Sequence, residues 1–556
     1  MISLLTVKLM KNALQVGSAW WLVAGIACGD PAQDRLQAGS IATNLGFLDA
    51  GIAEFGKAID LKPGFIEAYR DRGRALLSKG NFDGALADYT KVIELQPDSA
   101  ENYRARAEVK YAKYDLDGAL ADYTTAVKID PDFADAYANR SLVWIRKNDL
   151  DEALSDCNKA IELKPDLAVA YNNRGRIKTI KGDLEPAMAD FNKAIELNPA
   201  LAPAYSGRGT AKTSQGDLDG ALTDFNKAIE LDSGLAEAYA GRGSVKVARR
   251  DLDGALTDFD QAIKLNPDLP EAHSNRAMLR TIKGDWAKAL ADCDQAIELK
   301  PDMGETYIIR GGIKLAQKDS TGALADYNRA IALKPSLAPA YIYRGRLKQT
   351  NGDLYGAISD FSQAIVLHTD LAEAYRGRLE AREAQGDVEG ALADCGRLIA
   401  LNPKDAAAYD SHADLFYDLG DWTNALADYD KASGLDAQPR DHARFRACLI
   451  DIRLGRAAAA KAELRPWLAG HKAGQPDDWP SQIALYLAGQ STESALFQAA
   501  AGEAQQCQAC FYAASKRILA GDKAAAAGLF GKCLATGAKN SPDCRSASAA
   551  LKLLND

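Results

Sequence analysis

The chain has 556 residues, a formal net charge of −9 at pH 7 and 47% hydrophobic residues. The acidic balance argues against general nucleic-acid binding, because proteins of that kind carry an excess of Lys and Arg that contacts phosphates. The hydrophobic content is ordinary for a folded protein, and much of it is Ala, which suits closely packed helices.

The amino-terminal segment, residues 1–29, has the three zones of a secretory signal peptide. Two lysines precede an apolar run over residues 13–27, which ends in small residues before Cys28. We therefore expect export to the periplasm or cell envelope of a bacterium. Three alternatives stay open: lipid modification of Cys28, an uncleaved membrane anchor, or a buried capping helix in a cytoplasmic protein. The run is short for a membrane span, and no other stretch approaches one.

From residue 32 to residue 439 one 34-residue pattern repeats about twelve times without insertion. Its positions are numbered 1–34 here, with one unit running from Ala202 to Leu235. A fixed period of this length is that of a helix–turn–helix repeat, which grows by stacking and needs no single large core. Position 20 carries a small side chain where two helices cross closely, and it is Ala in eleven consecutive units: Ala85, Ala119, Ala153, Ala187, Ala221, Ala255, Ala289, Ala323, Ala357, Ala391 and Ala425.

Other positions of the repeat mark the ends of its two helices. Position 15 is mostly Gly and position 16 is Asp or Asn, which predicts Asp217, Asp251 and Asp285 as N-caps of second helices. Pro at position 32 ends the second helix in nine units. Position 24, one turn beyond the Ala of position 20, is Tyr, Phe or Cys.

This pattern resembles the tetratricopeptide repeat (TPR) family, in which position 4 is aromatic, 8 Gly or Ala, 20 Ala, 24 aromatic, 27 Ala and 32 Pro. The resemblance covers residues 32–439, with Ser233, Thr369 and Ala437 in place of the terminating Pro. It implies an all-α fold, an α-solenoid that forms a right-handed superhelix of roughly 28–30 helices. It also implies a concave groove lined by positions 2, 5, 6, 9, 12 and 13 of the first helices.

Charged residues recur at three positions of the repeat. Position 7 is Arg in ten consecutive units, from Arg72 to Arg378, and position 23 is Asp from Asp88 through Asp428. Position 11 is Lys or Arg in most units, one turn from position 7. A cationic track for an anionic polymer is one interpretation. We favour a structural ladder, because the acids of each unit match its bases in number and would neutralise such a track.

The repeat weakens in residues 440–556, which we interpret as degenerate repeat-like helices and a carboxy-terminal cap. Residues 441–474 keep a trace of the pattern, and a helical pair is expected in residues 475–506. Residues 507–540 form a legible unit, followed by a final helix over 541–554. A terminal cap is expected because the last unit of a solenoid must present a polar outer face.

The nine cysteines fall into groups. Cys157, Cys293 and Cys395 occupy position 24, where other units carry Phe or Tyr, and are expected to be buried. Four more gather near the end, and in an exported protein we expect one or two disulfides among them with the connectivity left open. A zinc site is disfavoured, because only one close-spaced pair is present. These four residues are Cys507, Cys510, Cys533 and Cys544.

No catalytic constellation is legible, and no metal site or cofactor is predicted. The five histidines are scattered, the carboxylates follow the repeat, and no Gly-rich phosphate loop follows a strand. We therefore predict that the protein is not an enzyme.

Partner-binding residues are predicted from the groove positions, which vary most between units. Amides at positions 5 and 6 can contact an extended peptide backbone without reading its sequence. Apolar residues at positions 5, 6 and 12 of adjacent units predict a site for a partner side chain, with burial against a neighbouring helix as the alternative. The amide set is Asn139, Asn172, Asn173 and Asn275, and the apolar set is Ile308, Ile309, Leu315, Ile342 and Tyr343.

The sequence thus predicts a non-catalytic scaffold that binds a protein or peptide segment in its groove. Nucleic acid is not expected as a partner, and a membrane is expected only through an amino-terminal anchor. The alternative is a regulatory or substrate-presenting adaptor subunit of an envelope enzyme.

Overall fold

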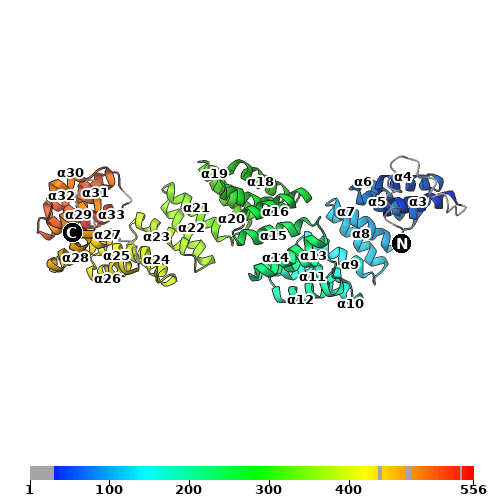
Figure 1. The fold of residues 1–556 in the computed structure, drawn as a ribbon, viewed down its shortest axis with the longest axis horizontal. Coiled ribbons are helices and arrows are strands. Elements are labelled where there is room, and N and C mark those ends of the chain that lie inside the picture. The colour runs from blue at the N-terminus through cyan, green and yellow to red at the C-terminus, as the bar shows by residue number, and fades with distance from the viewer. Residues whose placement is uncertain (1–29, 436–440, 471–477, 539–540, 556) are drawn as a thin grey trace. The chain divides into compact units, whose positions relative to one another are not determined.

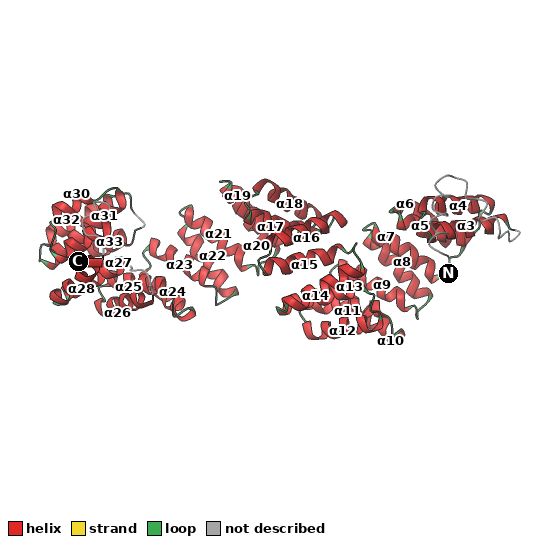
Figure 2. Ribbon diagram, viewed as in Figure 1, coloured by secondary structure: helices red, strands yellow, loops and turns green. Residues whose placement is uncertain are grey.

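The computed structural model describes residues 30–435, 441–470, 478–538 and 541–555, and every regular element among them is a helix (Figures 1 and 2). The predicted leader, residues 1–29 with Cys28, lies outside the described residues. None of the described helices has the length and apolar character that a membrane span requires. The described residues contain 31 helices, against the 28–30 expected for the whole chain.

Contacts divide the chain into two compact units, Met1–Leu279 and Arg280–Asp556, although the repeat pattern runs through both. α17 (Pro270–Ile282) spans the division. The described helices of the first unit are α3 (Pro31–Asn44), α4 (Leu48–Leu61), α5 (Ile66–Ser78), α6 (Phe82–Leu95), α7 (Ala100–Ala112), α8 (Leu116–Ile129), α9 (Ala134–Arg146), α10 (Leu150–Leu163), α11 (Ala168–Lys181), α12 (Leu184–Leu197), α13 (Ala202–Gln215), α14 (Leu218–Leu231), α15 (Ala236–Ala248) and α16 (Leu252–Leu265).

The second unit contains the remaining repeats and the carboxy-terminal helices. They are α18 (Trp286–Leu299), α19 (Gly304–Ala316), α20 (Ser320–Leu333), α21 (Ala338–Thr350), α22 (Leu354–Leu367), α23 (Ala372–Gln385), α24 (Val388–Leu401), α25 (Ala406–Leu419), α26 (Trp422–Leu435), α27 (Asp441–Arg453), α28 (Ala457–Gly470), α29 (Trp479–Ala488), α30 (Glu493–Ala499), α31 (Glu503–Leu519), α32 (Lys523–Ala535) and α33 (Pro542–Asn555).

Within each unit the helices stack in chain order. Each first helix packs on the second helix of its own repeat and on that of the repeat before, and the first helices α9, α11, α13 and α15 also contact one another in sequence. The predicted α-solenoid is therefore confirmed. Because first helices lie side by side, residues at the same repeat position form rows along one face.

The predicted helix starts are largely confirmed. Asp217 and Asp251 accept hydrogen bonds from the backbone N–H groups of Gly220 and Gly254, as N-caps do. Asp285 is also the N-cap residue of α18, as predicted, but its side chain makes no capping bond. Its carboxylate instead accepts a bond of 2.9 Å from Lys288, which stands where most capped units have Gly.

Position 15 adopts the left-handed backbone conformation in the linker between the two helices. Gly216 has φ of 83° there, which costs a residue without a side chain little. Tyr114, Asn148, Arg250 and Lys318 occupy the same position with φ between 62° and 67°. These four residues hold an unfavourable conformation because the helix–turn–helix geometry requires it.

The repeat core forms where the position 20 Ala meets the position 24 ring. Ala221 and Ala255 are fully buried, as are the three cysteines predicted to lie at position 24. Gly at position 8 lets the helices approach, since a Cβ on Gly311 would lie 2.6 Å from the Tyr327 ring. Most of these cores are small and involve neighbouring helices, as the repeat predicts. One core of the second unit continues from α21 to α25.

The carboxy-terminal helices pack differently from the repeats. Buried residues from α27 to α33 form one shared core that runs from Phe445 to Ala547. α33 also packs against α25, more than a hundred residues earlier in the chain. This end of the second unit is therefore held by contacts between distant segments.

Candidate partner-binding groove

The Arg–Asp ladder is structural. Arg242 donates two hydrogen bonds to Asp258 of its own second helix, of 2.9 and 2.7 Å. Its third nitrogen donates to Asn226 of the preceding second helix at 2.8 Å, and its guanidinium lies over the Tyr239 ring. The hydrogen bond to Asp258 raises the pKa of Arg242. The same two-pronged bond joins Arg72–Asp88, Arg106–Asp122, Arg140–Asp156, Arg174–Asp190, Arg208–Asp224, Arg310–Asp326, Arg344–Asp360 and Arg378–Asp394.

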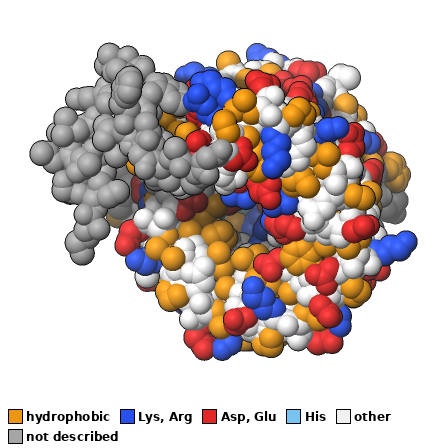
Figure 3. Space-filling model, turned by 90° about the vertical axis from the view of Figure 1, so that its right-hand side faces the viewer, with side chains coloured by type: hydrophobic (Ala, Val, Ile, Leu, Met, Phe, Trp, Pro, Cys, Tyr) orange, Lys and Arg blue, Asp and Glu red, His pale blue; other side chains and the backbone are white. Residues whose placement is uncertain are grey.

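The Lys of position 11 completes this arrangement. Lys246 lies 2.7 Å from the second carboxylate oxygen of Asp258, which is 3% exposed. Each such acid is thus paired with both bases of its own repeat. On the face shown in Figure 3, basic and acidic side chains are interspersed and no field of one sign covers it. These contacts support the structural interpretation of the ladder.

Two of the predicted amides are structural rather than free. Asn173 is 1% exposed, and its amide donates to the carbonyl oxygen of Ala138 at 3.0 Å and to the hydroxyl of Ser141 at 3.3 Å. Asn172 is 4% exposed and donates to Asn173. The predicted contact of Asn172 and Asn173 with a partner backbone is therefore wrong. Small residues on α9 allow α11 to approach closely, and the amides fill the contact.

The other two amides are half-buried and bonded to the preceding first helix. Asn139 donates to Glu108 at 3.2 Å, and Asn275 donates to the Ser244 hydroxyl at 3.2 Å. Arg104 binds Glu108 as well, so this part of the groove is filled by its own ion pairs. The predicted amides thus form hydrogen bonds between neighbouring first helices.

A pocket opens in the groove of the first unit, between α11, α13 and α15. It has a volume of about 440 Å³, within the range of ligand pockets. Phe191 borders it but is fully buried, and Gly207 lets α13 pack directly on that ring, because a Cβ there would lie 2.4 Å from Phe191. Ile180, 56% exposed, stands at the wall. The remaining lining residues are Arg176, Thr179, Pro203, Ser206, Thr210, Leu235 and Glu237.

This groove pocket has an apolar interior and a charged rim. The Thr179 and Thr210 hydroxyls bond carbonyl oxygens of their own helices. Arg176 and Glu237 are both exposed and supply opposite charges at the rim. The pocket accordingly fits one apolar side chain flanked by polar or charged groups. Except for Phe191 and Leu235, its residues occupy the groove positions, but Gly and Thr carried no apolar signal in the sequence.

The predicted apolar set on α19 and α21 is divided by the structure. Ile342 is 4% exposed and belongs to the core around Phe361, so its predicted contact with a partner is wrong. Ile308 is half-buried against the cores of its own and the next repeat. Tyr343 is 43% exposed and stacks on Tyr327. With Leu315, which is 38% exposed, and the half-buried Ile309, it forms an apolar patch.

At the carboxy-terminal end of the second unit, α33 lies across the groove positions. Arg545 of α33 lies 3.4 Å from Glu383, at position 12 of α23. Asp414, at position 9 of α25, accepts a hydrogen bond of 2.5 Å from Tyr429 and pairs with His442 at 3.1 Å. The groove of these last repeats is thus occupied by the chain itself.

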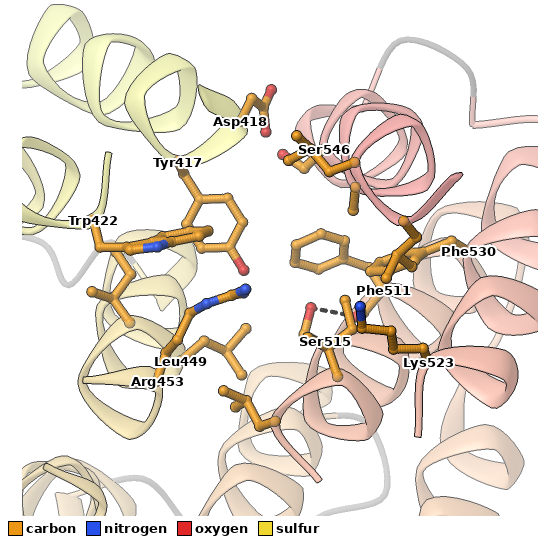
Figure 4. Close-up of a pocket in the computed structure, with 16 residues that line it drawn as sticks. Tyr417, Asp418, Trp422, Leu449, Arg453, Phe511, Ser515, Lys523, Phe530 and Ser546 are labelled. Carbon is orange, nitrogen blue, oxygen red and sulfur yellow. Dashed lines mark hydrogen bonds between the residues drawn. The ribbon is translucent and has the colours of Figure 1, made fainter. Parts of the chain in front are cut away.

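A second cavity, of about 190 Å³, lies between α25–α27 and α31–α33 (Figure 4). Trp422 and Arg453 face Phe511 and Lys523 across it. The guanidinium of Arg453 lies 4.4 Å from the Trp422 ring centre, so Arg453 already covers that face of the ring. This cavity is smaller than the groove pocket, and its own cations occupy its polar surface.

The four carboxy-terminal cysteines are free and buried. The structure brings Cys507, Cys533 and Cys544 together and leaves Cys510 outside the group. The predicted disulfides are not formed in this structure.

Comparisons with known proteins agree with the helical repeat. Family models described as TPR repeat match residues 73–113 and 209–248, and models described as tetratricopeptide repeat match 104–168, 168–201, 240–304 and 283–338. A search of curated proteins found no match.

Several solved structures are similar over parts of the chain. The APC/C hetero-tetramer Cut9–Hcn1 is 14% identical and aligns with 79% of this chain and 97% of its own, with a TM-score of 0.42. A tetratricopeptide repeat protein from Parabacteroides merdae is 24% identical and aligns with 42% of this chain and 93% of its own, with a TM-score of 0.32. YrrB, a TPR protein with an unusual peptide-binding site, is 26% identical and aligns with 33% of this chain and 95% of its own, with a TM-score of 0.26. Because each score is below 0.5, the fold assignment rests on the helices and the family models.

The helix pairs, their period and their small repeated cores define a helical-repeat solenoid. The chain belongs to the tetratricopeptide repeat family. Proteins of this family are in general non-catalytic, and the repeats make this chain a scaffold for protein–protein interaction.

Proposed function

We propose that the protein binds an extended segment of a partner protein in the groove of its first unit. The observation that carries the proposal is the groove pocket beside Ile180, which combines an apolar interior with a rim of Arg176 and Glu237. The partner segment places one apolar side chain in the pocket. An acidic group lies toward Arg176 and a basic group toward Glu237.

A second contact is proposed at the apolar patch of the second unit. Tyr343 supplies a rigid exposed ring held by Tyr327, and exposed aromatic residues of this kind often contribute most to binding. Ile309 and Leu315 extend the apolar surface. The predicted partner-binding set thus reduces to Ile309, Leu315 and Tyr343 here, with the groove pocket added.

We also propose that the protein acts in the bacterial periplasm or cell envelope. The support is the signal-peptide pattern of residues 1–29. A periplasmic scaffold and an adaptor subunit of an envelope enzyme differ in their partners. Stoichiometric recovery of a single enzyme with the protein would favour the adaptor.

Site-specific photo-crosslinking tests the groove proposal. A photoreactive amino acid replaces Ile180 in cells that produce the full chain, and crosslinked partners are identified by mass spectrometry. Leu61 is the control, because it is equally exposed at 56% but ends a second helix outside the groove positions. We expect a partner at 180 that is absent at 61.

Substitutions complete the test. Ile180→Asp is expected to lower recovery of that partner, and Leu61→Asp is expected to leave it unchanged. For the apolar patch, Tyr343→Asp is compared with Tyr355→Asp, since Tyr355 is 78% exposed on a second helix. Equal recovery with Ile180→Asp and with the unaltered chain would reject the groove pocket as the site.

A further inference from the structure

Three thiols from three helices meet inside the carboxy-terminal core. The sulfur atoms of Cys507 on α31, Cys533 on α32 and Cys544 on α33 all lie within 4.8 Å of one another. Their side chains are 0%, 0% and 4% exposed. The hydroxyl of Ser541 lies 3.5 Å from the Cys507 sulfur and adds an oxygen to the group.

The group does not follow the spacing of cysteines in the sequence. Cys507 and Cys510 are three residues apart on one helix, yet Cys510 lies outside the group. The packing of α32 and α33 on α31 selects the other two thiols. The sequence argued against a zinc site because only one close-spaced cysteine pair is present. That argument does not apply to this group, because its three thiols come from three different helices.

We propose that Cys507, Cys533 and Cys544 bind one zinc ion. Tetrahedral Zn–S bonds of about 2.3 Å place sulfur ligands about 3.8 Å apart. This separation lies between the 2.8 Å that separates the sulfurs of Cys507 and Cys533 and the 4.8 Å limit of the group. Small side-chain rotations therefore suffice to admit the ion.

Charge selects a divalent ion over a monovalent one. On binding, the three thiols release their protons to solvent and become thiolates, which carry three negative charges in a buried site. Zn²⁺ leaves a net charge of −1, whereas Cu⁺ would leave −2 at a greater desolvation cost. Ser541 or a water molecule would complete four ligands.

A disulfide between Cys507 and Cys533 is the competing outcome, because their sulfurs lie closest. Such a bond would use two ligands and leave Cys544 without a role. The convergence of three sulfurs, rather than two, favours the metal. A zinc ion there would join the last three helices, as structural zinc sites do.

The test measures metal content in the full chain, purified with a reducing agent and without chelators. We expect about one zinc ion per chain by elemental mass spectrometry. Replacement by Co²⁺ is expected to produce a thiolate-to-cobalt absorption band whose intensity scales with the number of Co–S bonds. Cys544→Ser should remove zinc and weaken the band, while Cys510→Ser should retain both.

Controls separate loss of the site from loss of the fold. Far-UV circular dichroism checks that each variant is helical, and Co²⁺ titration of the unaltered chain needs no variant. The proposal is overturned if the unaltered chain binds neither ion. It is also overturned if Cys544→Ser retains zinc, or if non-reducing peptide mapping of protein isolated without reducing agent or chelator finds Cys507 joined to Cys533.

Discussion

The guanidinium of Arg446 on α27 donates a hydrogen bond of 3.1 Å to Asp543 on α33, and the Arg446 side chain is completely buried. Arg446 stands at position 7 of its repeat, but position 23 is Ala462 instead of Asp. The Arg therefore turns to other acids, with Asp414 also 3.4 Å away. The arginine that elsewhere holds one repeat together here holds the final helix to the solenoid.

Arg446→Ala should strongly destabilise the carboxy-terminal helices. The substitution leaves Asp414 and Asp543 buried with only His442 as a cationic partner, at an expected cost of about 3–5 kcal/mol. Hydrogen exchange of α25, α27 and α33 measures it. Arg346→Ala is the control, because the Arg346–Glu373 pair is half-exposed on both sides. Equal protection in the two variants would contradict the structural role of Arg446.

Arg242→Ala should lower the stability of the first unit more than it lowers binding. It removes the two bonds to Asp258 and leaves that acid, 3% exposed, with Lys246 alone. We expect a loss of about 2–4 kcal/mol, below the cost of a fully buried pair because Arg242 is partly exposed. Hydrogen exchange of α15 and α16 reports it, and Lys227→Ala, in an exposed pair with Glu230, is the control. Weakened partner binding with unchanged melting temperature would favour a binding role for Arg242.

The linker conformation predicts opposite effects of two substitutions. Arg250→Gly relieves a side chain held at φ of 64° and should stabilise α15 and α16 by about 1 kcal/mol. Gly216→Ala places a side chain at φ of 83° and should destabilise α13 and α14 by a similar amount. Local hydrogen exchange measures both. The same sign of change in the two variants would be inconsistent with this backbone argument.

Glu383 predicts a pH dependence of stability. Burial raises its pKa to about 7 from 4.5, and Arg545 offsets part of the shift. The native state therefore holds this proton more tightly than the unfolded chain. The resulting stabilisation is present below the unfolded pKa and is lost as pH rises through about 7.

Glu383→Gln isolates this contribution from nearby groups. Asp418, whose pKa burial raises to about 6, acts in the same direction, and Asp414, whose pKa Arg446 and His442 lower, acts in the opposite one. Gln stays neutral, so the stability of the variant relative to the unaltered chain should increase as pH rises from about 5 to about 8. Thermal unfolding across this range measures the difference. A constant difference would show that Glu383 does not bind this proton.

The sequence by itself determined the two-helix repeat, the cysteines of position 24 and the Arg–Asp ladder. Each depends on contacts within one repeat or between neighbours, so a fixed residue spacing implies a fixed contact. Asp285 shows the limit, because a single change from Gly to Lys at position 19 redirects its side chain.

Only the tertiary structure decided which groove residues are exposed and which thiols meet. Asn173 and Ile342 occupy groove positions, yet close packing of adjacent helices buries them. The groove pocket is lined by residues of several helices, among them Ile180 of α11 and Glu237 of α15. The buried contacts of Arg446 join it to α33, about a hundred residues later, and no periodic spacing encodes contacts across that distance. The cysteine group likewise needs α33, which brings Cys544 to the other two thiols.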